Sequence, residues 1–381
     1  MSKLYLPHAD QFDQINENLM RIASAIGADI DVSTWAGIQK AVRVGVAPNL
    51  IPIGTQLTVN HVVYGDMLYD VVAHNHFKSA RNKNAHTMTL MCHDVIRTSI
   101  QFDAPEAFYY ADGDLTPGTY NFTISSTYSS LAAGTYCFTL TKTLPAGGQL
   151  CIVDESSGGN SAITDRKVYA YDKYPSRSFI EKSNIVNGST GTSLGTLGKE
   201  LNHVHRVYHG SNNYKESAVR QFLNSSAEAG SVWIPQTKYD CPPKWSDTLE
   251  GFMKGLDEEL LNTIGEVIVP CSTNDTYESP DSTTLKSQKY EVVDRIFLAS
   301  QQEVLGTSEN IVPDDSVLYP FFENATDTDR IKYNSGTSVP WGTRSAQALN
   351  ADVSRVVTPS GYAGTYHTNA MESCVPVFTI V

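Results

Sequence analysis

The sequence predicts an α+β protein with a short N-terminal coiled-coil helix and an inserted antiparallel β module. Apolar residues near the N-terminus recur at alternating intervals of three and four, which is typical of a coiled coil. Two strand-like segments of nearly the same sequence follow one another in the first half, beginning at Gly118 and Gly134. Beyond residue 200, helical and strand patterns are mixed. We therefore expect one β-rich body, with a helix before it and a small unit inserted into it.

The N-terminal segment 10–26 carries the a/d pattern. Its seam residues are Phe12, Ile15, Leu19, Ile22 and Ile26. Asp10 can cap the helix and Gly27 can end it. An isolated helix of this length is marginal in water, so the stripe must be covered by the chain's own domain or by other copies of the chain. Isoleucine at most seam positions favours three strands, so residues 1–27 are expected to hold a homotrimer together.

Composition excludes several classes of protein. Only 18% of the 381 residues are charged, against about 25% in ordinary soluble proteins. The formal charge of −13 argues against binding to nucleic acid, which requires clustered Lys and Arg. No stretch approaches the roughly 18 apolar residues of a membrane span, and the first residues show no signal peptide. We expect synthesis in a cytoplasm, without membrane insertion.

The cysteines are scattered and show no spacing typical of a metal site. They are Cys92, Cys137, Cys151, Cys241, Cys271 and Cys374. In a chain without a secretory signal, such residues are expected to be buried small hydrophobic side chains.

The first part of the chain reads as a helical connector, 28–47, followed by strands. Residues 34–44 form a helix that Ser33 or Thr34 caps and Gly45 ends. Two alternating segments flank Gly65-Asp66, a hairpin turn signal, and an apolar run covers 87–96. Residues 48–103 are thus the first part of the body.

Residues 104–155 have the texture of a separate unit. Gly118-Thr-Tyr-Asn-Phe-Thr-Ile and Gly134-Thr-Tyr-Cys-Phe-Thr-Leu each follow a turn and alternate aromatic with polar residues. The next segment, 156–199, ends in the tract Asn187 to Gly198, which has linker composition. We expect the two repeated segments to pair as strands of an inserted β module, and a linker to follow the module.

The remaining segment, 200–381, is expected to complete the body. Helical patterns cover 215–224 and 245–261, and a buried strand covers 292–298. Ser300-Gln-Gln-Glu is a helix start, and the chain ends on a strand, 375–381.

Four segments of the second half follow one another in a familiar order. They are Ser217-Ala-Val-Arg-Gln-Phe-Leu-Asn, Asp294-Arg-Ile-Phe-Leu-Ala-Ser-Gln-Gln-Glu, Trp341-Gly-Thr-Arg-Ser and Cys374-Val-Pro-Val-Phe-Thr-Ile. This order resembles the C-type-lectin-like fold, in the branch shared by formylglycine-generating enzymes and phage tropism-determining proteins. The resemblance implies one lectin-like domain made of 48–103 and 200–381, with a closing strand near the first strands. It also implies that Trp341 is buried and that Arg344 holds a loop.

The chemistry inherited by that family is not expected here. The catalytic cysteine pair of the enzymes has no counterpart in the last third of the chain, and the sugar-binding calcium motifs of the lectins are missing. Gly191-Thr-Ser193-Leu-Gly195 matches a nucleophile elbow, but no strand is expected before it. We therefore predict no catalytic residues and no cofactor.

Six histidines form a loose cluster in the sequence. They are His74, His76, His93, His203, His205 and His209. Two His-x-His pairs on adjacent strands could hold one ion. However, the segment has few carboxylates to orient the rings, and alternation of His with polar residues is common on exposed strands. We favour the polar surface and predict no metal.

The stretch 333–369 is rich in Tyr, Ser, Gly and Asn, the residues that antibody loops use for binding. The candidate receptor-binding residues are Tyr333, Asn334, Trp341, Tyr362, Tyr366, His367 and Asn369. In the phage proteins that the chain resembles, the equivalent stretch is the receptor-binding face. The expected function is therefore attachment of a bacteriophage virion, as tail fibre or tail tip, to a glycan or protein on the host cell surface. The alternatives are a structural protein of head fibre or baseplate that binds other virion proteins, and a tail-associated glycan hydrolase.

Overall fold

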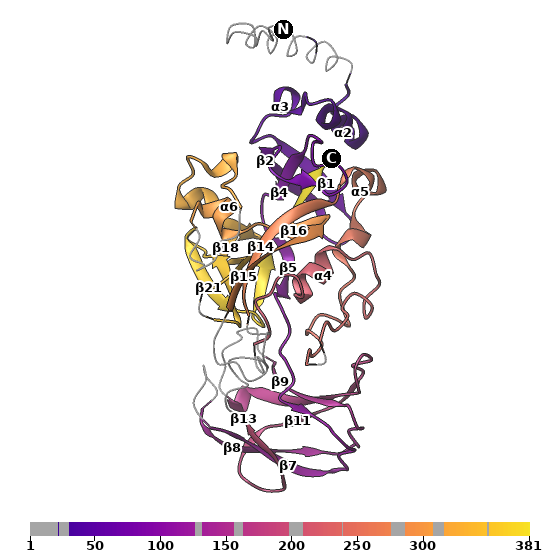
Figure 1. Cartoon of the computed structure of the whole chain (residues 1–381), viewed down its shortest axis with the longest axis vertical. Coiled ribbons are helices and arrows are strands. Elements are labelled where there is room, and N and C mark those ends of the chain that lie inside the picture. The colour runs from indigo at the N-terminus through magenta and orange to yellow at the C-terminus, as the bar shows by residue number, and fades with distance from the viewer. Residues whose placement is uncertain are drawn as a thin grey trace, which may run out of the picture.

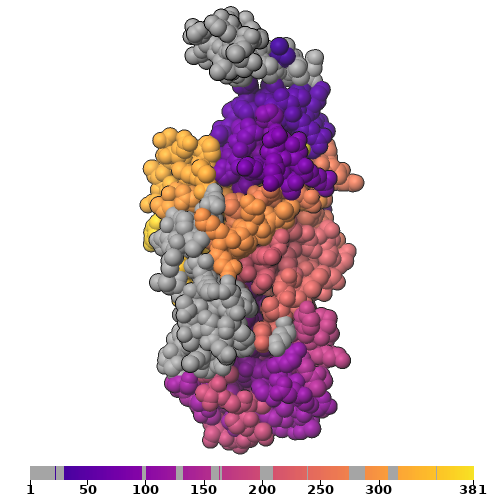
Figure 2. Space-filling model, in the orientation of Figure 1, coloured from indigo at the N-terminus to yellow at the C-terminus, as the bar shows by residue number. Residues whose placement is uncertain are grey.

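The computed structural model describes residues 22, 30–125, 132–155, 163–197, 209–237, 239–275, 286–307, 316–348 and 350–381. The fold is mixed and β-rich, consistent with an α+β protein. Helices α2 and α3 lie at one end of the molecule, the inserted module lies at the other, and the body is between them (Figure 1). The space-filling view shows the same order along the long axis (Figure 2).

The helices of the body are short. They are α2 (Trp35–Arg43), α3 (Ala47–Leu50), α4 (Ala218–Leu223), α5 (Glu258–Thr263) and α6 (Gln301–Leu305), with 3₁₀ turns at Phe252–Gly255, Pro320–Phe322 and Asp327–Arg330. Thr34 caps α2 by accepting a hydrogen bond from the amide of Gly37, as the sequence predicted. The predicted helix 245–261 is wrong, since only the 3₁₀ turn and the start of α5 fall there.

The first sheet of the body has the strand order β1-β2-β4-β23-β16. Its strands are β1 (Gln56–His61), β2 (Gly65–His74), β4 (Met88–Cys92), β23 (Pro376–Ile380) and β16 (Ile296–Leu298). The predicted hairpin is confirmed, but its turn is 62–64, and Gly65, at φ +73°, already begins β2. The closing strand β23 lies inside the sheet, with Pro376 at its first position, where a missing amide is tolerated.

A second five-stranded sheet has the order β21-β20-β19-β22-β5, beside a three-stranded sheet β15-β14-β3 and the hairpin β17-β18. The strands are β3 (Lys78–Ser79), β5 (Ile96–Gln101), β14 (Val267–Asp275), β15 (Lys286–Asp294), β17 (Lys332–Asn334), β18 (Thr337–Val339), β19 (Trp341–Ala346), β20 (Val353–Val357), β21 (Ala363–His367) and β22 (Met371–Cys374). One hydrophobic core joins α2, both large sheets and α4.

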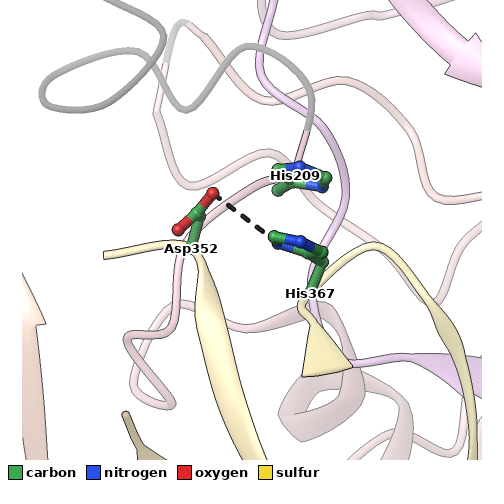
Figure 3. A group of neighbouring side chains, drawn as sticks. All are labelled: His209, Asp352 and His367. Atoms are coloured by element: carbon green, nitrogen blue, oxygen red, sulfur yellow. Dashed lines mark ion pairs between the residues drawn. The ribbon is translucent and has the colours of Figure 1, made fainter. Parts of the chain in front are cut away.

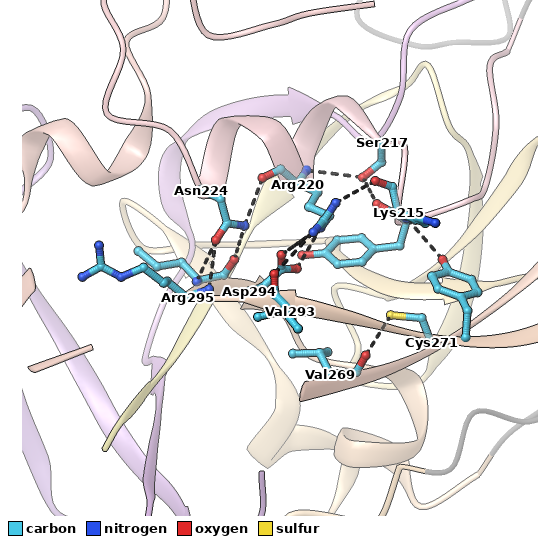
Figure 4. A network of polar contacts seen from close by, with 12 residues as sticks. Lys215, Ser217, Arg220, Asn224, Val269, Cys271, Val293, Asp294 and Arg295 are labelled. Atoms are coloured by element: carbon cyan, nitrogen blue, oxygen red, sulfur yellow. Dashed lines mark hydrogen bonds and ion pairs between the residues drawn. The ribbon is translucent and has the colours of Figure 1, made fainter. Parts of the chain in front are cut away.

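Two of the four recognised segments contact each other directly (Figure 4). Arg220 on α4 pairs with Asp294 at the end of β15, at 2.7 Å between Nη2 and Oδ1. The side chain of Asn224 donates to the carbonyl of Ile296 and accepts from the amide of Arg295. These contacts fix α4 against the end of β15 and the start of β16. The two segments therefore support the fold.

The third segment supplies a fully buried ion pair. Arg344 on β19 donates from Nη1 to Glu303 at 2.7 Å and from Nη2 to Ser316 at 2.9 Å. Tyr319 also donates to Glu303, at 2.9 Å. Ser300 and Glu303 form the capping box of α6, which confirms the predicted helix start. Arg344 therefore holds α6 and the segment at Ser316 on the sheet.

The inserted module is larger than predicted. It consists of two four-stranded sheets with the orders β11-β10-β9-β6 and β12-β8-β7-β13. Its strands are β6 (Tyr109–Tyr110), β7 (Gly118–Ile124), β8 (Gly134–Leu140), β9 (Gln149–Asp154), β10 (Arg166–Tyr171), β11 (Phe179–Asn184), β12 (Val186–Asn187) and β13 (Thr192–Leu197). The predicted pairing of the two repeated segments, β7 and β8, is confirmed.

The linker predicted at 156–199 is wrong. Strands β10 to β13 belong to the module and share its core, which runs from Phe108 to Leu197. The Gly/Ser/Thr tract forms β13, which pairs in parallel with β7, and its Ser193 lies on an exposed strand and not at an elbow. Backbone hydrogen bonds to β7 make this tract a strand despite its composition.

Two cysteines predicted to be free are bonded to each other. Cys151 on β9 forms a disulfide with Cys241 of the body, with 6.5 Å between the Cα atoms. Glu106 forms a bridge with Asp240 beside it, so the junction of module and body is paired along the backbone. Gly210, at φ +82°, follows in the returning chain, and a Cβ there would lie 2.1 Å from the carbonyl oxygen of Ala104. The outgoing and returning segments are thus in close contact.

Most of the predicted N-terminal seam lies outside the described residues. This applies to Phe12, Ile15, Leu19 and Ile26. Ile22 is helical, and its side chain is 57% exposed. Within the described residues, no helix has the length and apolar character needed to cross a membrane.

Candidate functional site

The structure separates the predicted receptor-binding residues into two groups. Tyr333 on β17, Tyr362 before β21 and Tyr366 on β21 are exposed, and Asn334 is partly exposed. Trp341 is fully buried and donates from Nε1 to the carbonyl of Arg330 at 3.1 Å. The predicted contact role of Trp341 is therefore wrong, because the indole fills the core.

Asn369 and His367 also face inward. Asn369 is buried, and its carbonyl accepts a hydrogen bond from Gln101. His367 is only partly exposed and stacks on His209. The stretch 333–369 thus offers separate exposed tyrosines, and its other members support the fold.

A larger aromatic surface lies in a groove where the module meets the body. The groove has a volume of about 740 Å³, within the range of small-molecule sites. It is lined by Val153, Glu155, Tyr169, Tyr171, Ser176, Arg177, Ser178, Phe179, Lys182, Gly230, Pro242, Pro243, Lys244, Ser246 and Asp247. One wall is the β9-β10-β11 face of the module, and the other is the body segment that follows the disulfide.

Strand periodicity puts the aromatic side chains of this wall on one face. Tyr169 and Tyr171 are two residues apart on β10, so they project to the same side of the sheet. Phe179 begins the neighbouring strand β11, and its ring centroid lies 5.6 Å from that of Tyr169 and 6.1 Å from that of Tyr171. The side chain of Phe179 remains 53% exposed. The three rings form an aromatic platform, of which Phe179 is exposed, Tyr169 is partly exposed and Tyr171 is buried.

Charged groups border the aromatic platform. Lys182 on β11 pairs with Glu155 at 2.5 Å and lies over the ring of Tyr169, with Nζ 5.8 Å from the centroid. Tyr169 donates its hydroxyl hydrogen to Glu155 at 2.8 Å. Arg177 donates to the carbonyl of Asp240 across the junction. Hydrogen-bonding groups and charges of both signs therefore lie within reach of a ligand that binds on the rings.

The environment shifts several pKa values in the groove. The hydrogen bond from Lys182 lowers the pKa of Glu155, so this carboxyl group is ionised at neutral pH. Burial lowers the pKa of Lys244 on the opposite wall and raises the pKa of the Tyr169 hydroxyl. The groove thus holds fixed charges and a neutral phenol, a combination suited to hydrogen bonding with a polar ligand.

Sequence reasoning missed this groove because it assigned 156–199 to a linker. The alternation in Arg166-Lys-Val-Tyr-Ala-Tyr is a strand signal that could have identified β10 and its aromatic face. The approach of 242–247 from the body had no signal of this kind.

The predicted histidine cluster is dispersed in the fold. His74 contacts the carbonyl of Ile51, His76 lies 3.7 Å from Glu303, and His93 pairs with Asp70 at 2.8 Å. His203 and His205 lie outside the described residues. The remaining member, His209, lies beside Asp352 and His367, which the sequence analysis had not joined to it (Figure 3).

The fold and the groove define a β-rich α+β protein that carries a small β module and an open aromatic site. Residues 176–380, more than half of the chain, match a family model described as a domain of unknown function, DUF6273, and the chain belongs to this family. The match begins in the module before β11 and ends with β23. Neither the curated proteins nor the solved structures contain a match to the chain.

Proposed function

We propose that this protein is a binding protein that attaches to a cell-surface glycan and that the aromatic groove holds the sugar. The observation that carries the proposal is the accessible part of the aromatic platform, which is the exposed ring of Phe179 beside the partly exposed ring of Tyr169. A pyranose ring has an apolar C–H face that packs on an aromatic ring, and its hydroxyls need donors and acceptors at the edge. Lys182 and Glu155 supply both at the border of the platform.

The proposed setting is the virion of a bacteriophage, where the protein acts in host attachment. The resemblance of the four scaffold segments to phage lectin-like proteins supports this setting. The lectin-like fold proposed for the body is supported by β23, which lies beside β4 in the sheet that β1 and β2 begin. The proposed homotrimer is supported by the exposed side chain of Ile22.

The glycan hydrolase remains a weaker candidate than a binding protein. A general acid for glycoside cleavage needs a raised pKa, whereas hydrogen bonds from Lys182 and Tyr169 lower the pKa of Glu155 in the groove. The groove therefore offers ionic and aromatic contacts that could hold a sugar but no general acid for its cleavage. This combination favours attachment over hydrolysis.

The test is binding of the purified protein to an array of bacterial surface oligosaccharides, followed by titration of the best ligand. Phe179→Ala and Tyr169→Ala should each weaken binding at least tenfold, because each removes a packing surface at the centre of the site. Because Phe179 is largely exposed, its truncation should leave the melting temperature unchanged.

Tyr362→Ala and Tyr366→Ala are matched controls, since they remove exposed tyrosines on the body, away from the groove residues. These variants should bind like the wild type. Loss of binding in the controls, with normal binding by the groove variants, would move the site to the tyrosines of 333–369. Absence of binding to any oligosaccharide would contradict the glycan proposal.

A further inference from the structure

Two imidazoles and a carboxylate meet at the junction of module and body. One nitrogen each of His209 and His367 and one oxygen of Asp352 lie within 4.8 Å of one another (Figure 3). Nδ1 of His367 is 3.8 Å from Oδ2 of Asp352. Among the described residues, this is the one group of three or more His, Cys, Asp or Glu side chains in which the donor atoms are close enough to share a metal ion.

The three side chains come from segments that the backbone holds firmly together. Asp352 immediately precedes β20, and His367 ends β21, where it is the register partner of Val353. His209 belongs to the chain that returns from the module. The amide of Asn212 in that chain donates to the carbonyl of Ala351 at 2.8 Å. The donors are therefore positioned by a strand pair and by the segment docked on it.

Neighbouring groups orient the ligands further. Nδ1 of His209 lies 3.1 Å from Oδ1 of Asn369, which leaves Nε2 as the nitrogen directed away from the amide. Thr368 donates its hydroxyl hydrogen to the carbonyl of His209 and its amide hydrogen to the carbonyl of Asp352. Metal-binding histidines commonly use the second ring nitrogen in this way, which fixes the ring and its tautomer.

We propose that His209, Asp352 and His367 bind one divalent transition-metal ion, of the class of Zn²⁺, and leave a coordination position open to water. Two nitrogen donors and one carboxylate are a ligand set that zinc accepts. The ion would tie the chain returning from the module to the sheet of the body. This site lies apart from the aromatic groove, so the proposal does not depend on the proposed function.

Binding requires a small rearrangement. The two rings are stacked, with centroids 3.6 Å apart and planes 9° from parallel. An ion about 2.0–2.2 Å from each donor needs the donors about 3.3 Å apart and lying in the ring planes. His367 has the freedom to turn out of the stack because its side chain is 27% exposed, whereas His209 is fully buried.

A buried cation lies near the two histidines. Burial lowers the pKa of His209 and of His367, and the charge of Arg166 lowers both as well. The positive charge of Arg166 would repel a metal cation bound here. The carboxylate of Asp352, whose pKa burial raises to about 7, is then the charge that the ion needs most.

The experiment is calorimetric titration of the intact, metal-free protein with Zn²⁺ at pH 7.5, with Co²⁺ as a spectroscopic probe. We expect one equivalent of Zn²⁺ to bind with micromolar or tighter affinity. A Co²⁺ absorption band of a four- or five-coordinate site should appear, and Zn²⁺ should abolish it. The melting temperature should rise with Zn²⁺ concentration, as for any ligand of the native state.

Asp352→Asn and His367→Gln should each weaken Zn²⁺ binding at least 100-fold, and Asn369→Leu should weaken it 10- to 100-fold through the orientation of His209. His93→Gln is the matched control, since His93 pairs with the carboxylate of Asp70 and lies outside the group of three, and this variant should bind Zn²⁺ normally. His367 is partly exposed, so its variant tests the site even if variants of buried His209 fail to fold.

Two results would overturn the proposal. One is a wild-type protein that shows no saturable heat or Co²⁺ band. The other is Zn²⁺ binding of equal affinity in the wild type, Asp352→Asn and His367→Gln, which would place the ion elsewhere.

Discussion

Cys151 of the inserted module is covalently bonded to Cys241 of the body, across a sequence separation of 90 residues. The bond lies in a small core of its own with Ala107, Val153 and Tyr171. The body segment that it holds continues directly into Pro242 and Pro243, which line the aromatic groove. The disulfide therefore supports one wall of the proposed site as well as the junction.

Replacing Cys151 by Ser should lower the free energy of unfolding by roughly 2–4 kcal/mol, because the unfolded chain regains the freedom of a long loop. Denaturant unfolding measures the loss, and Cys137→Ser, a free buried cysteine in the same module, is the control. Thiol titration of the denatured, unreduced wild type should find the four free cysteines. Six reactive thiols in oxidised protein would show that the bond does not form.

Glu303→Gln should destabilise the protein by about 3–5 kcal/mol, because it leaves Arg344 buried without its anion. The charge of Arg344 holds the pKa of Glu303 below its usual range despite the burial of this carboxyl group. The pair therefore stabilises the fold above the unfolded pKa of about 4.3, and this contribution is lost as the pH falls toward the lower folded value. Thermal unfolding between pH 3 and 7 measures both effects.

The matched control for Glu303→Gln is Glu266→Gln, which removes the exposed pair with Arg81. Exposed pairs contribute little, so its effect should stay below about 1 kcal/mol. Equal effects of the two substitutions would show that the buried pair is not important for stability.

Glu372→Gln should make the protein more stable at alkaline pH. Burial raises the pKa of Glu372 to about 8, so between pH 4.3 and 8 the folded state binds a proton that the unfolded state has lost. Stability therefore falls as the pH rises through this range, and the amide removes the dependence. The gain at pH 8 should be roughly 4–5 kcal/mol by chemical denaturation. Exposed Glu323→Gln should change nothing, and a wild-type stability that stays flat from pH 5 to 8 would contradict the argument.

Leu19→Lys combined with Ile22→Lys should convert the proposed homotrimer to monomers, because charges in an a/d seam cannot be buried against copies of themselves. Light scattering at micromolar concentration measures the mass. Ile234→Lys is the control, since Ile234 is an exposed isoleucine of the body, and this variant should keep the wild-type mass. A wild type that is monomeric at this concentration would exclude the seam as an oligomerisation site.

Local features of the fold could be predicted from the sequence. The cap at Thr34, the capping box of Ser300 and Glu303, and the pairing of the repeated strands β7 and β8 follow from neighbouring residues alone. Burial of Trp341 and the role of Arg344 in holding a loop also agree with what the resemblance implied. These features depend on backbone hydrogen bonds and periodicity, which a short segment encodes.

The errors have a common physical cause. The tract 187–198 has the composition of a linker, yet backbone pairing with β7 makes it a strand. Trp341 lies among residues typical of a binding loop, yet its neighbours bury it completely. In both cases contacts with distant segments decided the conformation, and composition did not.

By itself, the sequence determined the β-rich α+β character, the presence of an inserted module and the caps of helices α2 and α6. Each of these is set by residues close together in the chain. The tertiary structure alone decided the extent of the module, the Cys151–Cys241 bond, the aromatic groove and the group of His209, Asp352 and His367. Each of these joins segments far apart in the sequence. Their proximity follows from packing and strand order, and no local pattern records it.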